Sequence, residues 1–133
     1  MDWNLRLIQA KDFLRARPTG EVDLDLAEQL LLGLARENAA PSQYDVLIDD
    51  RGADVSLSFT DMAELVQVMI ENRDSFRSKL AILTLPGQRF DRAKFMELYA
   101  GNRGFSVAAF EQFEEALNWL ALEGDEAELA SAE

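Results

Sequence analysis

Cysteine and histidine are both missing from this chain of 133 residues. Without cysteine the chain has no disulfide, no thiolate nucleophile and no cysteine-ligated zinc. Without histidine it has no Ser-His-Asp triad and no histidine general base, and it lacks the imidazole group, which is the commonest metal ligand. Because few enzymes lack both residue types, we expect a protein with no enzymatic activity, metal or cofactor. An enzyme that uses only carboxylates and arginines is the remaining catalytic alternative.

Positive charge is also scarce, since 13 basic residues stand against 25 acidic residues and give a formal net charge of −12. The sequence shows no basic patch that could neutralise phosphates. This argues against nucleic acid and against anionic lipid surfaces as partners. The acidic excess favours basic or neutral partners.

Long apolar runs are absent as well. No segment approaches the roughly 20 apolar residues of a membrane span. The first residues, Met1-Asp2-Trp3-Asn4-Leu5, have neither the basic region nor the apolar run of a signal peptide. We therefore expect a cytoplasmic protein.

The length and the hydrophobic content suit one domain. Hydrophobic residues make up 48% of the chain, which is enough for a real core. The final stretch, residues 123–133, is acidic and contains no basic residue. We expect residues 1–122 to form the domain and residues 123–133 to form a flexible tail.

Two hydrophobic periodicities predict the architecture. An antiparallel hairpin is predicted by the alternation around Leu5 and Leu7 and by the pair Phe13-Leu14. It ends at the turn Arg17-Pro18-Thr19-Gly20. The later pattern predicts strands at residues 44–48, 79–85 and 105–110, and helices at 25–36, 62–70, 91–100 and 111–122. This order is typical of an α/β fold with a mixed sheet of about five strands and right-handed parallel crossovers.

The central strand and the segment after it organise the rest of the chain. The run Val46-Leu47-Ile48 is typical of a strand that is covered on both faces. A charged turn with Gly52 follows, then a loop at residues 54–60 and a helix start. Ser58 and Asp61 have the spacing of a capping box, and Thr60 is a second N-cap candidate. In open α/β sheets such a crossover is where ligands and partners usually meet the fold.

These residues resemble a known family. The strand Leu47-Ile48-Asp49, the pair Arg51-Gly52 and the helix start Leu57-Ser58-Phe59-Thr60-Asp61 resemble the SpoIIAA-like (STAS-related) family of small bacterial proteins. The strand at residues 79–83 and the closing strand and helix at 105–110 and 113–120 resemble it too. The resemblance covers most of residues 3–122, and its motifs are structural rather than catalytic.

The resemblance implies a STAS/SpoIIAA-like fold, a five-stranded sheet with helices, and no known enzymatic chemistry. Anti-sigma factor antagonists of this family carry a phosphorylated Ser or Thr in an Asp-Ser-x-Gly type motif at the start of the helix after the central strand. Ser56, Ser58 and Thr60 lie in the corresponding region of this chain, but that motif does not occur.

We therefore expect a non-enzymatic regulatory or partner-binding module that uses the loop and helix after the central strand. The residues expected to set specificity are Asp49, Arg51, Ser58, Thr60 and Asp61. Phe59 or Met62 would be the apolar anchor. Ser58 and Thr60 could accept a phosphate at the helix N-terminus, but capping is the favoured role, because the position calls for a cap in any case.

A carrier of a small apolar ligand or lipid is the alternative function. Its pocket between sheet and helices would be lined by Met62, Met69, Met96, Phe90, Phe95 and Tyr99. Core packing is the simpler explanation of those side chains. A homodimer through the first hairpin or through an exposed helix is a further alternative.

Three other groups of residues have a functional and a plain interpretation. An oxygen-ligand metal site is one interpretation of Asp45, Asp49, Asp50 and Asp54, but we favour a solvated turn in which Asp49 or Asp50 pairs with Arg51. Arg89 and Arg92 could bind an anion, but a plain turn is favoured. Trp119 is expected in the core rather than at an interface.

Overall fold

The computed structural model describes residues 3–8, for which only the backbone course is given, 13–37 and 44–122. The main sheet consists of strands β1 (Trp3–Ile8), β2 (Phe13–Pro18), β4 (Asp45–Asp49), β6 (Leu80–Leu83) and β7 (Val107–Phe110). A second sheet consists of β3 (Gly20–Val22) and β5 (Ala53–Val55). The helices are α1 (Leu24–Glu37), α2 (Phe59–Glu71), α3 (Gln88–Gly101) and α4 (Phe113–Ala121), with a short 3-10 helix, η1 (Arg73–Ser75), after α2.

The main sheet has the strand order β1-β2-β4-β6-β7. β1 runs antiparallel to β2, and every other neighbouring pair is parallel. This confirms the predicted mixed sheet with an N-terminal hairpin and four helices. Residues 9–12, which join the two strands of the predicted hairpin, and the expected tail at 123–133 lie outside the described residues.

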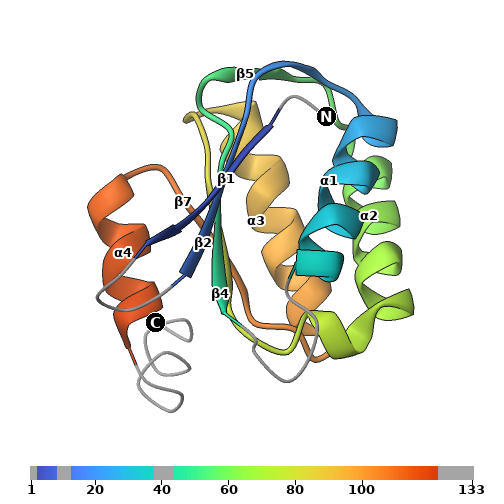
Figure 1. Ribbon diagram of the computed structural model, residues 1–133. Coiled ribbons are helices and arrows are strands. Elements are labelled where there is room, and N and C mark those ends of the chain that lie inside the picture. Colours follow the sequence, from blue (N-terminus) through green and yellow to red (C-terminus); the bar gives the residue numbers. More distant parts are fainter. Residues whose placement is uncertain (1–2, 9–12, 38–43, 123–133) are drawn as a thin grey trace.

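The sheet lies between two unequal helical layers (Figure 1). Helices α1, α2 and α3 cover one face, and α4 covers the other. The three crossovers into β4, β6 and β7 all move the chain in the same direction across the sheet, so right-handed connections place all three helices on one side. None of the helices in the described ranges is long and apolar enough to span a membrane.

Each central strand contributes to a core on both faces, as the apolar run in the sequence predicted. Val46 of β4 belongs to the large core beneath α1, α2 and α3. Leu47, the next residue, belongs to the smaller core beneath α4. Successive strand residues point to opposite faces, so a continuous apolar run fills both cores.

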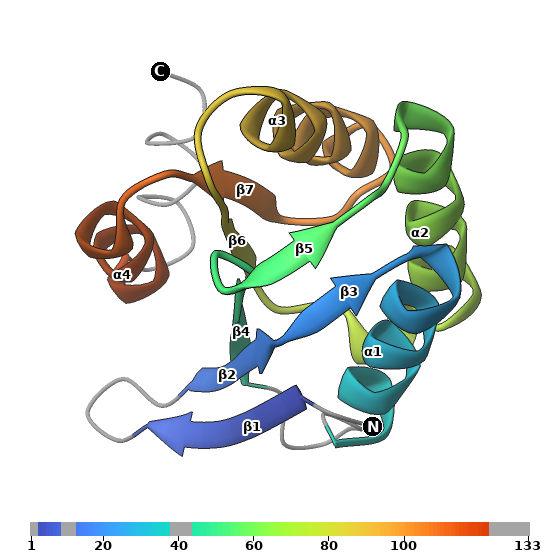
Figure 2. The same cartoon turned by 90° about the horizontal axis from the view of Figure 1, so that it is seen from above.

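The two-stranded sheet was missed from the sequence. The interval at residues 54–60 was expected to be a loop, but Ala53–Val55 forms β5 and pairs in parallel with Gly20–Val22. Figure 2 shows β3 and β5 side by side above the main sheet. Each strand has three residues, which is too short for an alternating pattern to be recognised. Gly20 has φ +73°, a left-handed value that lets β3 start directly after β2.

Some expected boundaries were also wrong. α3 begins at Gln88 rather than at residue 91, because the turn after Pro86 leads directly into the helix. The strands expected at 79–85 and 105–110 are shorter, and cover Leu80–Leu83 and Val107–Phe110.

Lys79, directly before β6, fixes the end of α4. Its Nζ donates to the carbonyl oxygens of Trp119, Leu120 and Leu122. Trp119 and Leu120 lie in the last turn of α4 and Leu122 is its C-cap, and that last turn has no basic residue of its own. A cation there satisfies free carbonyls and complements the helix dipole. Trp119 is buried beside Lys79, with its ring 5.6 Å from Nζ, which confirms its expected place in the core.

We predict that Lys79→Met lowers the free energy of unfolding by about 1–2 kcal/mol, because buried carbonyls lose their donor. Urea unfolding followed by far-UV circular dichroism measures the change. Lys94→Met is the matched control, since Lys94 is exposed and pairs with Glu97 three positions along α3, and it should change stability by less than about 0.5 kcal/mol. Equal losses in the two variants would contradict the role given to Lys79.

Candidate functional site

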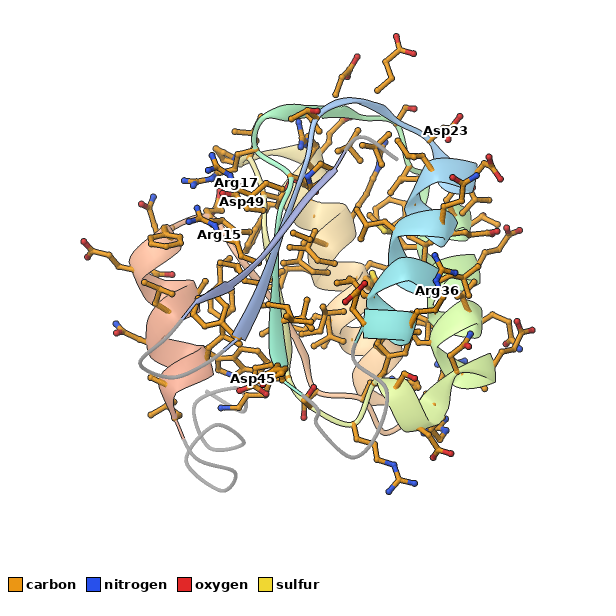
Figure 3. All side chains as sticks on the ribbon, in the orientation of Figure 1. Arg15, Arg17, Asp23, Arg36, Asp45 and Asp49 are labelled. Atoms are coloured by element: carbon orange, nitrogen blue, oxygen red, sulfur yellow. The ribbon has the colours of Figure 1, made fainter. Side chains whose placement is uncertain are left out.

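The carboxyl ends of β2 and β4 bring together charged side chains from two distant segments. β2 pairs with β4 in parallel, with Arg15 opposite Leu47 and Ala16 opposite Ile48. This register brings Arg17 beside Asp49. Figure 3 shows Arg15, Arg17 and Asp49 grouped at the upper end of the sheet. Carboxyl ends of parallel strands are the usual place for ligands in open α/β sheets.

Asp49 is a buried carboxylate surrounded by arginines. Its side chain is 3% exposed. Arg51 approaches it with a bidentate fork, since Nε lies 2.9 Å from Oδ1 and Nη2 lies 2.9 Å from Oδ2. The backbone N–H of Arg51 also donates to Oδ1, and Nη2 of Arg15 lies 3.4 Å from Oδ2. The expected Asp49–Arg51 pairing is confirmed, but the expected solvated turn is wrong at Asp49.

The arginines determine the charge of Asp49. Burial acts to raise the pKa of this carboxyl group, but the hydrogen bonds and charge of Arg51, together with the hydrogen bond from Arg15, outweigh burial and hold the pKa below its ordinary value of 3.8. The hydrogen bonds with Asp49 in turn raise the pKa of Arg51. Asp49 is therefore a stable negative charge at neutral pH.

Asp50 faces the other side of the sheet and has a separate partner. Nη2 of Arg89, at the start of α3, lies 2.8 Å from Oδ1 of Asp50. Arg89 also donates to the backbone carbonyls of Asp50 and Ala53. Burial raises the pKa of Asp50 above its ordinary value, despite a hydrogen bond from Thr84 and the charge of Arg89. Arg89 is thus engaged inside the fold, which removes it as an anion ligand.

The acidic residues considered as metal ligands do not converge. Asp45 lies at the opposite end of β4 from Asp49, about 13 Å away at the usual rise of a strand, and accepts a hydrogen bond from the backbone N–H of Lys79. Figure 3 shows these two aspartates far apart. Asp54 is exposed on β5. Within the described ranges, no three acidic side chains are grouped in a way that could hold a metal ion.

The first turn of α2 has the expected capping box. Oγ of Ser58 accepts a hydrogen bond from the backbone N–H of Asp61, and the carboxylate of Asp61 accepts one from the backbone N–H of Ser58. Ser58 is the N-cap, so Thr60 is the second residue of the helix and is exposed. Phe59 begins the helix and is 49% exposed.

The residues expected to form the partner surface divide into two groups. Arg51, Ser58, Phe59 and Thr60 are exposed, and Asp61 is half-buried. Asp49 and Met62 are buried, at 3% and 8% exposure. Met62 packs into the core because it lies one helical turn past the cap on the face toward the sheet. As placed, Asp49 and Met62 lie behind the exposed residues and offer no contact to a partner.

An internal cavity lies beneath the three helices. Its volume is about 70 Å³, and apolar side chains from α1, α2, α3, β3 and β5 line most of it. Of the six residues expected to line a pocket, only Met62 and Met96 do so. Met69 is in the core. The other three residues, Phe90, Phe95 and Tyr99, are partly buried and pack against this core.

The sequence did not predict that Arg15 and Arg17 belong to this site, and so it did not predict a basic cluster. The two residues are two positions apart in a strand and so share a face, which the sequence does indicate. Their meeting with Asp49 depends on the parallel register of β2 and β4, for which no local signal exists. The expectation that the chain has no basic patch is therefore wrong at this point.

We predict that Asp49→Asn lowers the free energy of unfolding at pH 7 by about 2 kcal/mol, because charged hydrogen bonds are lost. The folded pKa of Asp49 lies below the ordinary 3.8, so its stabilisation is present above that value and is lost as pH falls through the folded pKa. The difference between wild type and variant should therefore shrink as the pH falls below 3.8.

Urea unfolding at a series of pH values measures this difference. Asp74→Asn is the control, because Asp74 forms an ion pair with Arg77 in which both side chains are exposed, and its effect should stay below about 0.5 kcal/mol at every pH. A difference for Asp49→Asn that does not change with pH would show that the carboxylate charge is not what stabilises the turn.

Comparison with known proteins shows the fold of this chain. No family model matches the chain, and no curated protein matches it. Among solved structures, the chain is similar to an uncharacterised protein of the DUF3478 family from Shewanella loihica, which has a SpoIIAA-like fold. The TM-score is 0.62 at 18% sequence identity, over 90% of this chain and 92% of the other. The chain therefore has the SpoIIAA-like fold that its sequence motifs predicted.

Proposed function

We propose that this domain is a non-enzymatic regulatory module that binds a protein partner through the β4–α2 connection and the first turn of α2. The SpoIIAA-like fold supports a module of STAS type. The observation that carries the proposal is Phe59, an aromatic side chain that is 49% exposed at the first position of α2.

Phe59 is exposed but held in place. Its ring meets that of Phe95 edge-on, with centroids 5.3 Å apart. The guanidinium of Arg92 lies 5.8 Å from the ring centroid of Phe59 on the same side of α3. A side chain that is already ordered loses little entropy on binding, and aromatic anchors provide much of the energy of protein interfaces.

Further aromatic side chains extend this surface along α3. Phe95 lies 5.5 Å from Tyr99, and the guanidinium of Arg103 lies 3.5 Å above the ring of Tyr99. Leu98, on the neighbouring side of α3, is 66% exposed. An apolar centre with arginines at both ends suits a partner that presents apolar side chains flanked by acidic ones.

Polar residues of the connection would form the rim of the interface. Ser58 and Thr60 flank Phe59 and are exposed, Asp61 is half-buried, and Arg51 is exposed earlier in the connection. Rim residues contribute specificity more than affinity. Asp49 would act indirectly, because it fixes the guanidinium of Arg51.

We predict that Phe59→Ser abolishes recovery of a stoichiometric protein partner in an affinity pull-down from the source cells. The matched control is Leu32→Ser on α1, which removes another exposed apolar side chain, 39% exposed, away from this surface. Far-UV circular dichroism should show both variants folded. Loss of the partner from both variants, or from neither, would overturn the proposed surface.

Phosphorylation at the helix start is part of the proposal, and the capping box distinguishes its two candidates. A phosphate on Ser58 would replace the compact Oγ cap with a bulky, doubly charged group and place negative charge next to the carboxylate of Asp61. Thr60 takes no part in the capping bonds and lies in the first turn, where the helix dipole favours negative charge. We infer that Thr60 is the position that accepts a phosphate without loss of the helix start.

The acidic substitutions Ser58→Glu and Thr60→Glu test this inference. Ser58→Glu should lower the free energy of unfolding by about 1 kcal/mol through loss of the cap, whereas Thr60→Glu should leave it unchanged or raise it by about 0.3–1 kcal/mol. Chemical unfolding at low ionic strength measures both effects. A loss for Thr60→Glu as large as that for Ser58→Glu would remove Thr60 as the tolerated position.

The cavity keeps a carrier of a small apolar ligand as a second candidate function. Its volume of about 70 Å³ is less than half of the roughly 150 Å³ that holds a benzene molecule in a protein core. Only an occupant of a few heavy atoms fits, and a lipid would require the helices to move apart. Native mass spectrometry of the purified protein tests it, because a discrete added mass without a protein partner would favour the carrier.

A further inference from the structure

Three arginines converge on one carboxylate at the carboxyl ends of β2 and β4. We call Arg15, Arg17 and Arg51 the arginine cluster. Their ion pairs with Asp49 measure 3.4, 4.0 and 2.9 Å respectively. Three guanidinium groups against one carboxylate leave two positive charges in excess. This is unusual in a chain with only 13 basic residues and a net charge of −12.

The cluster lies on the face of the sheet that α4 covers only in part. Phe13 belongs to the core beneath α4, and side chains two residues apart share a face, so Arg15 and Arg17 point to the same side. Arg15 is held against α4, since its guanidinium lies 4.8 Å above the ring of Phe113. Arg17 and Arg51 stay open to solvent, with side chains 57% and 38% exposed.

The open arginines border a polar depression. Its volume is about 410 Å³, and it is lined by Arg17, Pro18, Thr19, Asp49, Arg51 and Gly52. This volume is within the range of pockets that hold small molecules, about 300–1,000 Å³. The apolar cavity beneath α1, α2 and α3 is separate and much smaller.

Asp49 does not use up the donors of the cluster. Its two oxygens already accept from Nε and Nη2 of Arg51 and from Nη2 of Arg15. Nε of Arg17 is 4.0 Å from Oδ2, which is too far for a hydrogen bond. Each guanidinium carries five N–H donors, so Arg17 and the remaining donors of Arg51 are available at the rim of the depression.

The charge and geometry match one class of ligand. Arginine forks bind oxyanions through paired hydrogen bonds, and a phosphate monoester carries a charge of about −1.5 to −2 at neutral pH. That charge balances the two positive charges in excess. Acidic residues that lie farther from the cluster than the Debye length of about 8–10 Å weaken this attraction little, because salt screens their charge.

We propose that the arginine cluster is a binding site for the phosphate group of a small phosphomonoester. Arg17 and Arg51 would donate to the phosphate oxygens. Asp49 would hold Arg51 in the orientation that presents its remaining donors, and Arg15 would contribute charge from beneath α4. The site shares Arg51 with the rim of the proposed partner surface, but Arg17 lies on β2 and Phe59 on α2, so Arg17→Gln and Phe59→Ser test the two proposals separately.

A titration of inorganic phosphate into the ¹⁵N-labelled protein at constant ionic strength tests the proposal. Saturable shifts are expected in the backbone amide signals of Arg17, Arg51 and Gly52 and in the guanidinium Nε–H signals of the two arginines. Arg17→Gln should weaken the affinity about tenfold, through loss of one charged hydrogen-bonding group. Arg77→Gln is the control, since Arg77 is 71% exposed and paired with Asp74, and it should leave the affinity unchanged.

Two further measurements make the test decisive. Arg17→Gln should keep the circular dichroism spectrum and unfolding midpoint of the wild type, because Arg17 makes no hydrogen bond with Asp49. Acetate, with a single charge, should bind more weakly than phosphate at the same site. Shifts that do not saturate, equal affinity in Arg17→Gln and wild type, or acetate binding as tight as phosphate would each overturn the proposal.

Discussion

The ion pair between the buried carboxylate of Asp49 and Arg51 fixes the geometry of this site. A buried charge is costly unless it is paired and hydrogen-bonded, and removing one partner leaves that cost uncompensated. Arg51 meets the requirement with both its backbone N–H and its guanidinium, so a residue two positions past the end of β4 is fixed in side chain and backbone together. The turn between β4 and β5 is therefore defined by the need to neutralise one aspartate.

A second ion pair holds the same turn from the opposite face. Arg89 of α3 binds the side chain and carbonyl of Asp50 and the carbonyl of Ala53. Adjacent residues of a strand point to opposite sides, so Asp49 is paired beneath α4 and Asp50 beneath the other helices. These contacts join β2, β4, β5 and α3, and they place the start of α2 where Phe59 emerges beside Phe95.

The strand end separates two surfaces of different character. The side toward α4 carries the arginine cluster and a polar depression, whereas the side toward α2 and α3 carries exposed aromatic rings. An overall negative chain can hold both, because charge acts locally once salt screens distances beyond about 8–10 Å. A net charge of −12 thus describes the average surface and not the environment of Arg17.

Features that depend on neighbours along the chain could be predicted from the sequence. The periodicities predicted the order of the main-sheet strands and the helices, the run at Val46 predicted a strand buried on both faces, and the Ser58–Asp61 spacing predicted the helix start. The Asp49–Arg51 pair was also accessible, since only two positions separate its members. Contacts between Asp49 and Arg15 or between Asp50 and Arg89 were not, because they join residues 34 and 39 positions apart. Strand register and layer packing bring these distant segments together. The long-range ion pairs, the burial of Asp49 and the pairing of β3 with β5 therefore follow from the tertiary structure.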